Sequence, residues 1–332
     1  MEKDFYIGVD VGNFDTKSSF TSTPTGISEH SSKEMGITEY LEYENKGYAP
    51  DENHSSYRRD KTTSDKAFIL TLFAISKEII YVIKNGNHIT HKDNELTSEE
   101  RDMIQSRINE IATVHLGIGL PPTHLGKSDE NVKYYKDKFG DGVDYKYNGF
   151  VFHYGLGKIR VYPQDYAAIL TYRSKKEDFP TSYPSYNAVD IGGITVDVCP
   201  IINGKLDAPH CRSLQMGILV IYEEIITYVD RKYEIQLTTT DIENVIKGEK
   251  TVLSADVISD INRIVSDRAN GIIDKLIQEG IDFKTRPTVF LGGGSLMLAE
   301  AIKKNPLVMN YDFITDPNVN AKAFKALLKA GA

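Results

Sequence analysis

Hydrophobic and polar residues along the chain follow two periods, which predict strands and helices in two successive groups. Apolar residues at helical spacing over 67–84 predict an amphipathic helix, and a capping-box pattern at Thr97 and Glu100 begins a second helix. Short apolar runs that end in glycine or proline turns predict buried strands. Each group of strands is followed by helices, so the pattern favours two α/β units. The principal strands are expected at 5–10, 111–119, 158–161, 187–191, 195–201 and 288–291, and the principal helices at 67–84, 128–139, 163–171, 216–232, 255–278, 295–304 and 320–330.

The composition of the 332-residue chain agrees with this picture and excludes several classes of protein. Hydrophobic residues make up 40 % and charged residues 26 %, which excludes disorder as the main state. Lys and Arg number 39 against 47 Asp and Glu, and the net charge of −8 argues against a protein that coats nucleic acid by charge. The two cysteines, Cys199 and Cys211, form no Cys-x-x-Cys motif, which argues against a disulfide scaffold or a zinc site.

The most apolar segment, 67–83, is expected to be a buried helix and not a membrane span, because Lys77 and Glu78 interrupt it. The N-terminal sequence M-E-K-D-F leads directly into a predicted strand, so no signal peptide is expected. Unpaired cysteines are typical of a reducing compartment. We therefore expect a cytoplasmic protein without a membrane partner.

The most informative feature of the sequence is a repeated element. Residues 10–17 read D-V-G-N-F-D-T-K, and residues 190–197 read D-I-G-G-I-T-V-D. Each follows an apolar strand, begins with Asp and has Gly two residues later. Two such hairpin tips in the two halves of the chain predict a duplicated architecture with a cleft between the halves.

The residue types in this element suit a nucleoside triphosphate. Glycine lets the backbone approach a phosphate and leaves its N–H groups free to donate. Lys17 adds a positive charge for the β- and γ-phosphates, and Thr16 and Thr195 add hydroxyl donors. Asp10 and Asp190 provide hard oxygen ligands for Mg²⁺, mostly through its waters. A single Asp-x-Gly is also ordinary turn chemistry, so the prediction depends on the pair.

A third glycine-rich segment follows the last predicted buried strand. Residues 289–296 read V-F-L-G-G-G-S-L, with Gly292, Gly293 and Gly294 between the strand and a helix. A planar ligand or a phosphate can lie against such bare backbone. Glycines also allow a strand and a helix to pack closely, so this segment gains its meaning from its position after the two hairpins.

Taken in order, these elements resemble the superfamily of ATPases that comprises actin, the sugar kinases and the seventy-kilodalton heat-shock chaperones. Their pattern consists of a first phosphate loop, a connecting helix, a second phosphate loop and an adenosine loop, and it covers the chain apart from about 25–100. Within the superfamily, the chain is most similar to the ParM-type actin-like proteins of bacteria and plasmids. The G-L-P sequence at 119–121 and N-V-N-A-K-A-F-K at 318–325 carry this likeness. Ala323 stands where their closing helix is expected to have glycine.

The resemblance implies an α/β fold, namely the two-domain actin-like (ribonuclease H-like) ATPase fold with an interdomain nucleotide cleft. Domain I would comprise residues 1–168 and 315–332, with an insertion at about 25–100. Domain II would comprise residues 169–314. The role of the insertion does not follow from the resemblance.

The resemblance also implies roles for individual residues. Gln164 falls where the family places the residue that orients the attacking water, and a neutral amide positions water but is a poor base, so slow hydrolysis is expected. The alternative is an ordinary polar residue at a helix N-terminus. Gly217 and one of Glu223 and Glu224 resemble the ribose-binding segment, and we choose Glu223. The implied nucleotide-binding residues are Gly12, Asn13, Asp15, Thr16, Lys17, Gly192, Gly193, Thr195, Gly217, Glu223, Gly292, Gly293 and Gly294, the implied catalytic residues are Gln164, Asp190 and Asp10, and the implied Mg²⁺ ligands are Asp10 and Asp190.

The function implied by the resemblance is that of a filament protein that binds and hydrolyses ATP, or GTP, with Mg²⁺ and drives plasmid or DNA segregation. Its partners would be further copies of itself and a DNA-binding adaptor of the ParR type, without direct nucleic-acid contact. A small-molecule kinase of the same superfamily is the alternative, and it would need a carboxylate base such as Asp197. A chaperone ATPase is a third alternative, for which no client-binding segment is expected.

Overall fold

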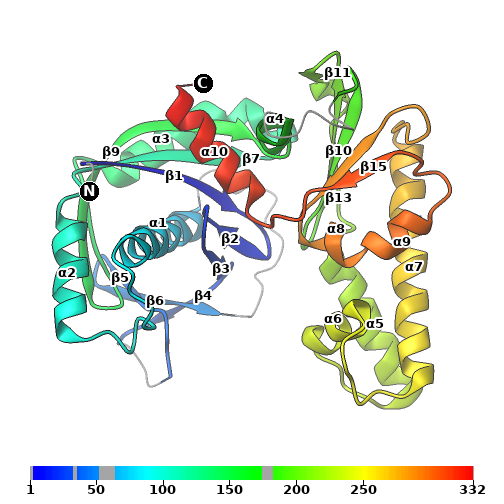
Figure 1. Cartoon of the computed structure of the whole chain (residues 1–332), viewed down its shortest axis with the longest axis horizontal. Coiled ribbons are helices and arrows are strands. Elements are labelled where there is room, and N and C mark those ends of the chain that lie inside the picture. Colours follow the sequence, from blue (N-terminus) through cyan, green and yellow to red (C-terminus); the bar gives the residue numbers. More distant parts are fainter. Residues whose placement is uncertain (1–2, 33–35, 52–63, 174–181, 332) are drawn as a thin grey trace. The chain divides into compact units, whose positions relative to one another are not determined.

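The computed structural model places the chain in two compact units, which are described separately below (Figure 1). Its described residues are 3–32, 36–51, 64–173 and 182–331. In these ranges, no helix combines the length and the apolar character that a membrane crossing requires.

The first unit combines both ends of the chain on one nine-stranded sheet. It comprises Met1–Leu120, His124–Thr171 and Asn318–Ala332. Its helices are α1 (Asp65–Gly86), α2 (Ser98–Asn109), α3 (Ser128–Phe139), α4 (Tyr166–Arg173) and α10 (Val319–Ala330). Its strands run in the order β3 (Ser22–Pro24), β2 (Asp15–Lys17), β1 (Asp4–Val11), β7 (Thr113–Leu120), β9 (Phe150–Pro163), β8 (Val143–Tyr147), β5 (Leu41–Tyr43), β6 (Lys46–Asp51) and β4 (Gly26–His30).

Helices α1 and α10 cover opposite faces of the sheet at β1 (Figure 1). Glycines in β1 and β7 let α10 lie directly on the backbone. A Cβ at Gly8 would lie 1.9 Å from the carbonyl oxygen of Ala321, and a Cβ at Gly117 would lie 3.0 Å from that of Phe324. On the other face, the neighbouring Ile7 belongs to the apolar cluster that contains the α1 side chains. Because side chains alternate along a strand, Gly8 and Asp10 face α10 while residues 7, 9 and 11 face α1.

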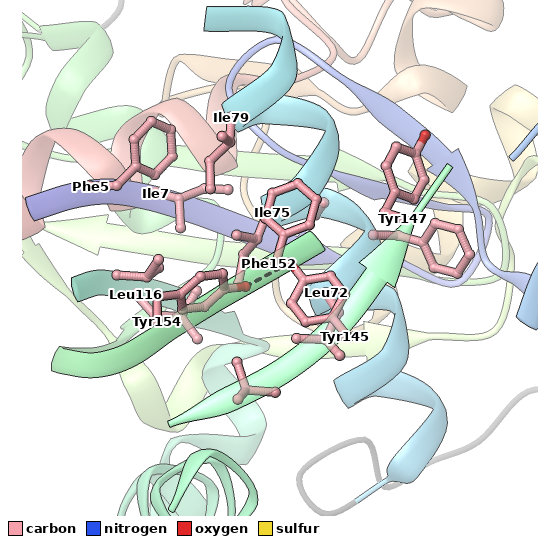
Figure 2. Close-up of a cluster of buried hydrophobic side chains, with 14 of the residues drawn as sticks. Phe5, Ile7, Leu72, Ile75, Ile79, Leu116, Tyr145, Tyr147, Phe152 and Tyr154 are labelled. Carbon is pink, nitrogen blue, oxygen red and sulfur yellow. Dashed lines mark hydrogen bonds between the residues drawn. The ribbon is translucent and has the colours of Figure 1, made fainter. Parts of the chain in front are cut away.

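The largest apolar core of this unit lies between α1 and the sheet (Figure 2). Leu72 and Ile75 of α1 are fully buried there. Tyr145 and Tyr154 also point into this core, and their hydroxyl groups share a hydrogen bond of 2.7 Å. Burial raises the pKa of both tyrosines, so both stay neutral. The apolar segment at 67–83 is therefore a buried helix, as predicted.

The charged residue that interrupts this segment is also buried. Glu78 has no exposed side-chain surface, and its carboxylate lies 2.6 Å from Nζ of Lys325 in α10. It also accepts a hydrogen bond of 2.7 Å from the backbone N–H of Ser19, in the turn between β2 and β3. A buried carboxylate must be paired, so Glu78 connects α1 to α10 and to the β2–β3 turn.

The second unit is built on a smaller sheet and comprises Pro121–Thr123 and Tyr172–Pro317. Its strands run in the order β12 (Lys205–Leu206), β11 (Val196–Ile202), β10 (Tyr186–Ile191), β14 (Thr288–Leu291) and β15 (Tyr311–Phe313), and β13 (Arg212–Leu214) also pairs with β11. Its helices are α5 (Ile218–Tyr233), α6 (Thr239–Lys247), α7 (Ala255–Gln278), α8 (Gly293–Met297) and α9 (Ala299–Lys304). Their apolar side chains form a single core with β10, β11 and β14.

The two sheets share one topology. In each, an antiparallel three-stranded meander continues into two parallel strands, as β3-β2-β1-β7-β9 in the first unit and β12-β11-β10-β14-β15 in the second. The first two strands of each meander pair in the same register, with Asp10 opposite Lys17 and Asp190 opposite Asp197. The duplication predicted from the repeated element is confirmed by this topology.

Several predicted boundaries were wrong. Pro163 ends β9 opposite Leu120 and does not begin a helix, because the next residue, Gln164, extends the strand by donating its N–H to the Leu120 carbonyl. The helix predicted at 295–304 is divided at Leu298 into α8 and α9. Strand β15 was not predicted. Within 25–66, where the sequence did not distinguish loops from a small sheet, β4, β5 and β6 extend the large sheet through β8.

Candidate functional site

The turn between β1 and β2 is closed by glycine. The N–H of Gly12 donates to the carbonyl of Asp15 at 3.0 Å. A Cβ at Gly12 would lie 2.5 Å from that same oxygen, so no larger residue fits without moving the turn. This tight turn leaves Asn13 and Phe14 at its tip.

Two carbonyl groups of this turn accept hydrogen bonds from one residue that the sequence did not single out. Thr25 donates its hydroxyl to the carbonyl of Gly12 at 3.2 Å and its N–H to the carbonyl of Phe14 at 2.9 Å. Thr25 is buried, and it lies in a Ser- and Thr-rich stretch where no local signal distinguishes it. By donating to two carbonyl groups of the tip, Thr25 fixes the turn.

The strands on either side of the turn separate the predicted residues into two sets. Asp10 and Lys17 are directly opposite one another and therefore share a face with Asp15. Within the described residues, Lys17 forms no ion pair, so its charge is available to a ligand. Thr16 faces the other way, is only 1 % exposed, and its hydroxyl has no hydrogen-bond partner in the described part of the chain. This placement argues against the phosphate contact predicted for Thr16.

Gln164 lies in the turn between β9 and α4, and its side chain reaches back to the first hairpin. Its Nε2 donates to Oδ1 of Asp10 at 2.5 Å, across 154 positions of sequence. A polar residue that only capped its own helix would not make this contact. The structure therefore brings Gln164 and Asp10 together, as the predicted site requires.

The hairpin between β10 and β11 has the same turn as the first. The N–H of Gly192 donates to the carbonyl of Thr195 at 2.9 Å, as Gly12 does to Asp15. Thr195 thus occupies the position of Asp15 and not that of Thr16. Its hydroxyl donates to Oδ2 of Asp197 at 2.8 Å.

The carbonyl groups of the second turn are occupied by the first residues of α5 and the residue before it. The N–H groups of Gly217, Ile218 and Leu219 donate to the carbonyls of residues 194, 192 and 193 at 2.8, 3.0 and 2.8 Å. A Cβ at Gly217 would lie 2.4 Å from the Gly193 carbonyl oxygen, so glycine is required for this approach. In the described residues, the N–H of Gly193 has no protein acceptor. The close approach of α5 to the turn therefore explains why residue 217 is glycine, independently of any ribose contact.

The third glycine segment lies against the end of β10. Gly292 has a φ of 85°, and a Cβ there would lie 2.0 Å from Oδ1 of Asp190. A Cβ at Gly294 would lie 2.7 Å from the carbonyl oxygen of Ile191. Gly293 begins α8. Within the second unit, the structure therefore gathers Asp190, the second hairpin and the glycine segment at one place.

The two candidate glutamates of α5 differ in their contacts. Glu224 forms an ion pair with Arg268 of α7, with Nη2 and Oε1 2.6 Å apart, and this bond raises the pKa of Arg268. Glu223 is exposed and has no ion-pair partner among the described residues. The difference supports the choice of Glu223, since Glu224 is already engaged. No group of three His, Cys, Asp or Glu side chains that could hold a metal occurs in the described ranges.

Comparisons with known proteins bear on the fold of both units. Residues 188–304 match the model of the family described as archaeal actin homologue MreB-like, C-terminal. The archaeal actin homologue Ta0583 superposes over 98 % of this chain and 99 % of its own, with a TM-score of 0.72 and 17 % identity. A ParM from Clostridium botulinum, solved as a 15-stranded filament, covers 98 % of this chain and 99 % of its own, with a TM-score of 0.64 and 17 % identity. The comparison with curated proteins gives no match.

The chain has the fold of the actin homologues. This fold confirms the predicted fold class and the predicted resemblance to actin-like proteins. AlfA from the B. subtilis plasmid pLS32, solved as a filament, shares this fold with a TM-score of 0.59 and 14 % identity, over 97 % of both chains. Ta0583 has also been solved in complex with ADP, and AlfA as a filament bound to AMPPNP.

Proposed function

We propose that the chain is an actin-like nucleoside triphosphatase that binds ATP, or GTP, with Mg²⁺ and assembles into filaments. The observation that carries the proposal is the pair of Asp-x-Gly hairpins with one turn geometry, one in each half of a duplicated actin-like fold. Filament structures of ParM and AlfA, and nucleotide complexes of AlfA and Ta0583, support it. The predicted domains I and II would place the nucleotide between them.

The hairpin turns fit a triphosphate in both shape and polarity. Thr25 engages two carbonyl oxygens of the first turn, and the start of α5 engages those of the second, so that these oxygens repel phosphate less. Their glycines allow a close approach, and Lys17 adds a cation that forms no ion pair among the described residues. Gly12, Asn13, Asp15, Gly192, Gly193 and Thr195 would then surround the phosphates, Gly217 and Glu223 the ribose, and Gly292, Gly293 and Gly294 the adenosine.

Asp10 and Asp190 fit a cation held mainly through its waters, because each is a carboxylate at the end of a central strand beside a glycine turn. When bound, Mg²⁺ supplies charge neutralisation for the β- and γ-phosphates. Asp10 also accepts the hydrogen bond from Nε2 of Gln164, which leaves the amide oxygen of Gln164 to accept a hydrogen bond from water. An amide does not take the proton from that water, so we expect slow hydrolysis.

We further propose that hydrolysis destabilises the filament and that the filament segregates plasmid or other DNA in the cytoplasm. The net charge of −8 favours contact with DNA through a ParR-type adaptor over direct binding. The kinase alternative receives no support from Asp197, whose carboxylate accepts a hydrogen bond from Thr195. A kinase would pass the γ-phosphate to a small molecule, whereas the proposed enzyme passes it to water.

The proposal is tested by measuring phosphate release and light scattering together, with ATP, GTP, ADP or no nucleotide. We expect scattering to rise with a triphosphate and Mg²⁺, and phosphate release to follow the rise. Pelleting and negative-stain images of the same samples identify filaments. A folded chain that neither binds nor hydrolyses either triphosphate, and forms no polymer at any salt concentration, would show that the proposal is wrong.

A further inference from the structure

The turn that carries Gln164 contains a residue in an unusual backbone conformation. Asp165 has a φ of 63° and is only 2 % exposed. Residues other than glycine seldom adopt left-handed conformations, and they keep them only where the surrounding structure holds them. The Asp165 carbonyl accepts the N–H of Ile169 at 2.9 Å, so this residue begins α4 from an unusual backbone angle.

A residue from the other end of the chain holds Asp165. Asn320, in the first turn of α10, accepts the N–H of Asp165 on its Oδ1 at 3.0 Å. Its Nδ2 lies 3.5 Å from Oδ1 of Asp165, and both contacts are buried. Asn320 is 6 % exposed, and its side chain bonds to no other residue in the described part of the chain. One side chain therefore satisfies both the backbone and the carboxylate of Asp165.

The position of Asn320 is set by the close packing of α10. Phe324, one turn further along the helix, lies over β7, where a Cβ at Gly119 would come within 2.3 Å of its ring. The same Cβ would lie 2.7 Å from Cγ of Gln164. Helix α10 therefore lies against the Gln164 turn at two places. At one, Asn320 forms its hydrogen bonds with Asp165. At the other, Phe324 and Gln164 both lie in the space that a side chain at Gly119 would fill.

We propose that Asn320 is a positioning residue for Gln164, an inference that rests on the proposed nucleotide hydrolysis. By holding Asp165 in the left-handed conformation, Asn320 turns the chain so that the Gln164 amide meets Asp10 at 2.5 Å. Without it, the turn relaxes toward ordinary backbone angles and the amide moves away from Asp10. Because Asn320 bonds to Asp165 and to neither hairpin turn, its loss affects hydrolysis and not nucleotide binding.

The test uses the 332-residue chain and four variants, with kcat and KM for ATP hydrolysis measured separately from nucleotide affinity. For Asn320→Ala we expect kcat to fall by about 10- to 100-fold at unchanged affinity, since misplacing a positioned group by about 1 Å costs up to about 100-fold. Asn318→Ala is the matched control, because it removes an asparagine from the same helix end, where its Nδ2 lies 3.5 Å from the Thr21 carbonyl. We expect that control to hydrolyse ATP like the wild type.

Two further variants separate positioning from folding. Asp165→Gly accepts a positive φ without strain and keeps the N–H that Asn320 binds, so we expect kcat to stay near the wild-type value. The double exchange Asp165→Asn with Asn320→Asp restores an amide–carboxylate pair at the same place, and we expect it to recover most of the activity lost in Asn320→Ala.

Three results would overturn the inference: an Asn320→Ala chain with wild-type kcat, one that loses nucleotide affinity at unchanged kcat, or a double exchange that recovers nothing while remaining folded. A wild-type chain that binds ATP and never hydrolyses it would instead show that the proposed function is wrong, and this inference with it. The wild-type assay therefore distinguishes the two failures before any variant is made.

Discussion

The two hairpins have the same backbone turn, but at one equivalent position their side chains carry opposite charges. Gly12 and Gly192 close equivalent turns, with N–H to carbonyl distances of 3.0 and 2.9 Å. Opposite the aspartate that begins each motif, however, the first hairpin has Lys17 and the second has Asp197. Glycine and strand register thus fix the shape of the turn, while the facing position decides whether the hairpin offers a cation or an anion.

The hairpins also differ in what supports them. The hydroxyl and the backbone N–H of Thr25 donate to the first turn. Three successive backbone N–H groups at the start of α5 donate to the second. The second turn is therefore part of a helix–sheet junction. The first depends on a short local contact, which predicts that it is the easier one to deform. Four comparisons between variants test these differences, in order of decreasing effect.

Gly217→Ala should have the largest effect. Its Cβ would lie 2.4 Å from the Gly193 carbonyl oxygen and 2.5 Å from the Ile194 carbonyl carbon, both of them backbone atoms. Separating α5 from the turn should cost about 3 kcal/mol of unfolding free energy, at the upper end of overpacking effects. Denaturant unfolding measures it. The matched control is Gly271→Ala in the middle of α7, where nothing lies within 4 Å and a small gain in stability is expected.

Lys17→Ala should weaken ATP binding by about 30-fold, or about 2 kcal/mol, which is typical of a lost charged hydrogen bond. Asp197→Asn, at the equivalent position of the other hairpin, keeps an acceptor for Thr195 and removes a negative charge. It should not weaken binding. Titration calorimetry with ATP and Mg²⁺ gives both affinities, and equal losses in the two variants would contradict the difference drawn between the hairpins.

Gly12→Ala and Gly192→Ala should differ although the turns match. The added Cβ would lie 2.5 Å from the Asp15 carbonyl oxygen in the first turn, but 3.4 Å from that of Thr195 in the second, which is ordinary contact. We expect a loss of about 1.5 kcal/mol for Gly12→Ala and less than about 0.5 kcal/mol for Gly192→Ala. Thermal unfolding of the two variants side by side measures this, and a larger loss for Gly192→Ala would refute it.

Thr25→Val should have the smallest effect, about 1 kcal/mol, because it removes a single hydrogen bond to the Gly12 carbonyl while its backbone N–H still reaches Phe14. Thr25→Ser keeps the hydroxyl and should unfold like the wild type. Identical stability of the Val and Ser variants would mean that the hydroxyl does not support the turn.

Much of the fold was predictable because its signals are local. The capping box at Thr97 gave α2 its start, and the helical period over 255–278 gave α7 both of its bounds. The hairpin at 187–201 followed from two apolar runs around glycines. Strand β15 has only three residues and forms by pairing with β14, so no period could reveal it.

The candidate site was predictable in its residue types but not in its supports. The Asp-x-Gly motifs, Lys17 and Gln164 are visible because each belongs to a short pattern. Thr25, Asp165 and Asn320 are not, since their roles arise from contacts that join distant segments and from one unusual backbone angle. The side chain of Thr16 faces away from those of Asp10 and Lys17 because of the strand register, which the spacing of residues in the motif did not reveal.

The first unit is assembled from separate segments of the sequence, and this arrangement sets the order in which the chain can fold during synthesis. Its sheet and its α10 come from segments far apart in the sequence, and the carboxylate of Glu78 cannot form its ion pair with Lys325, 247 positions later, until α10 has been synthesised. Almost all of the second unit is one continuous segment, 172–317, that can fold beforehand. A chain that ends before α10 would therefore leave the buried carboxylate of Glu78 without its ion pair, which should destabilise the first unit.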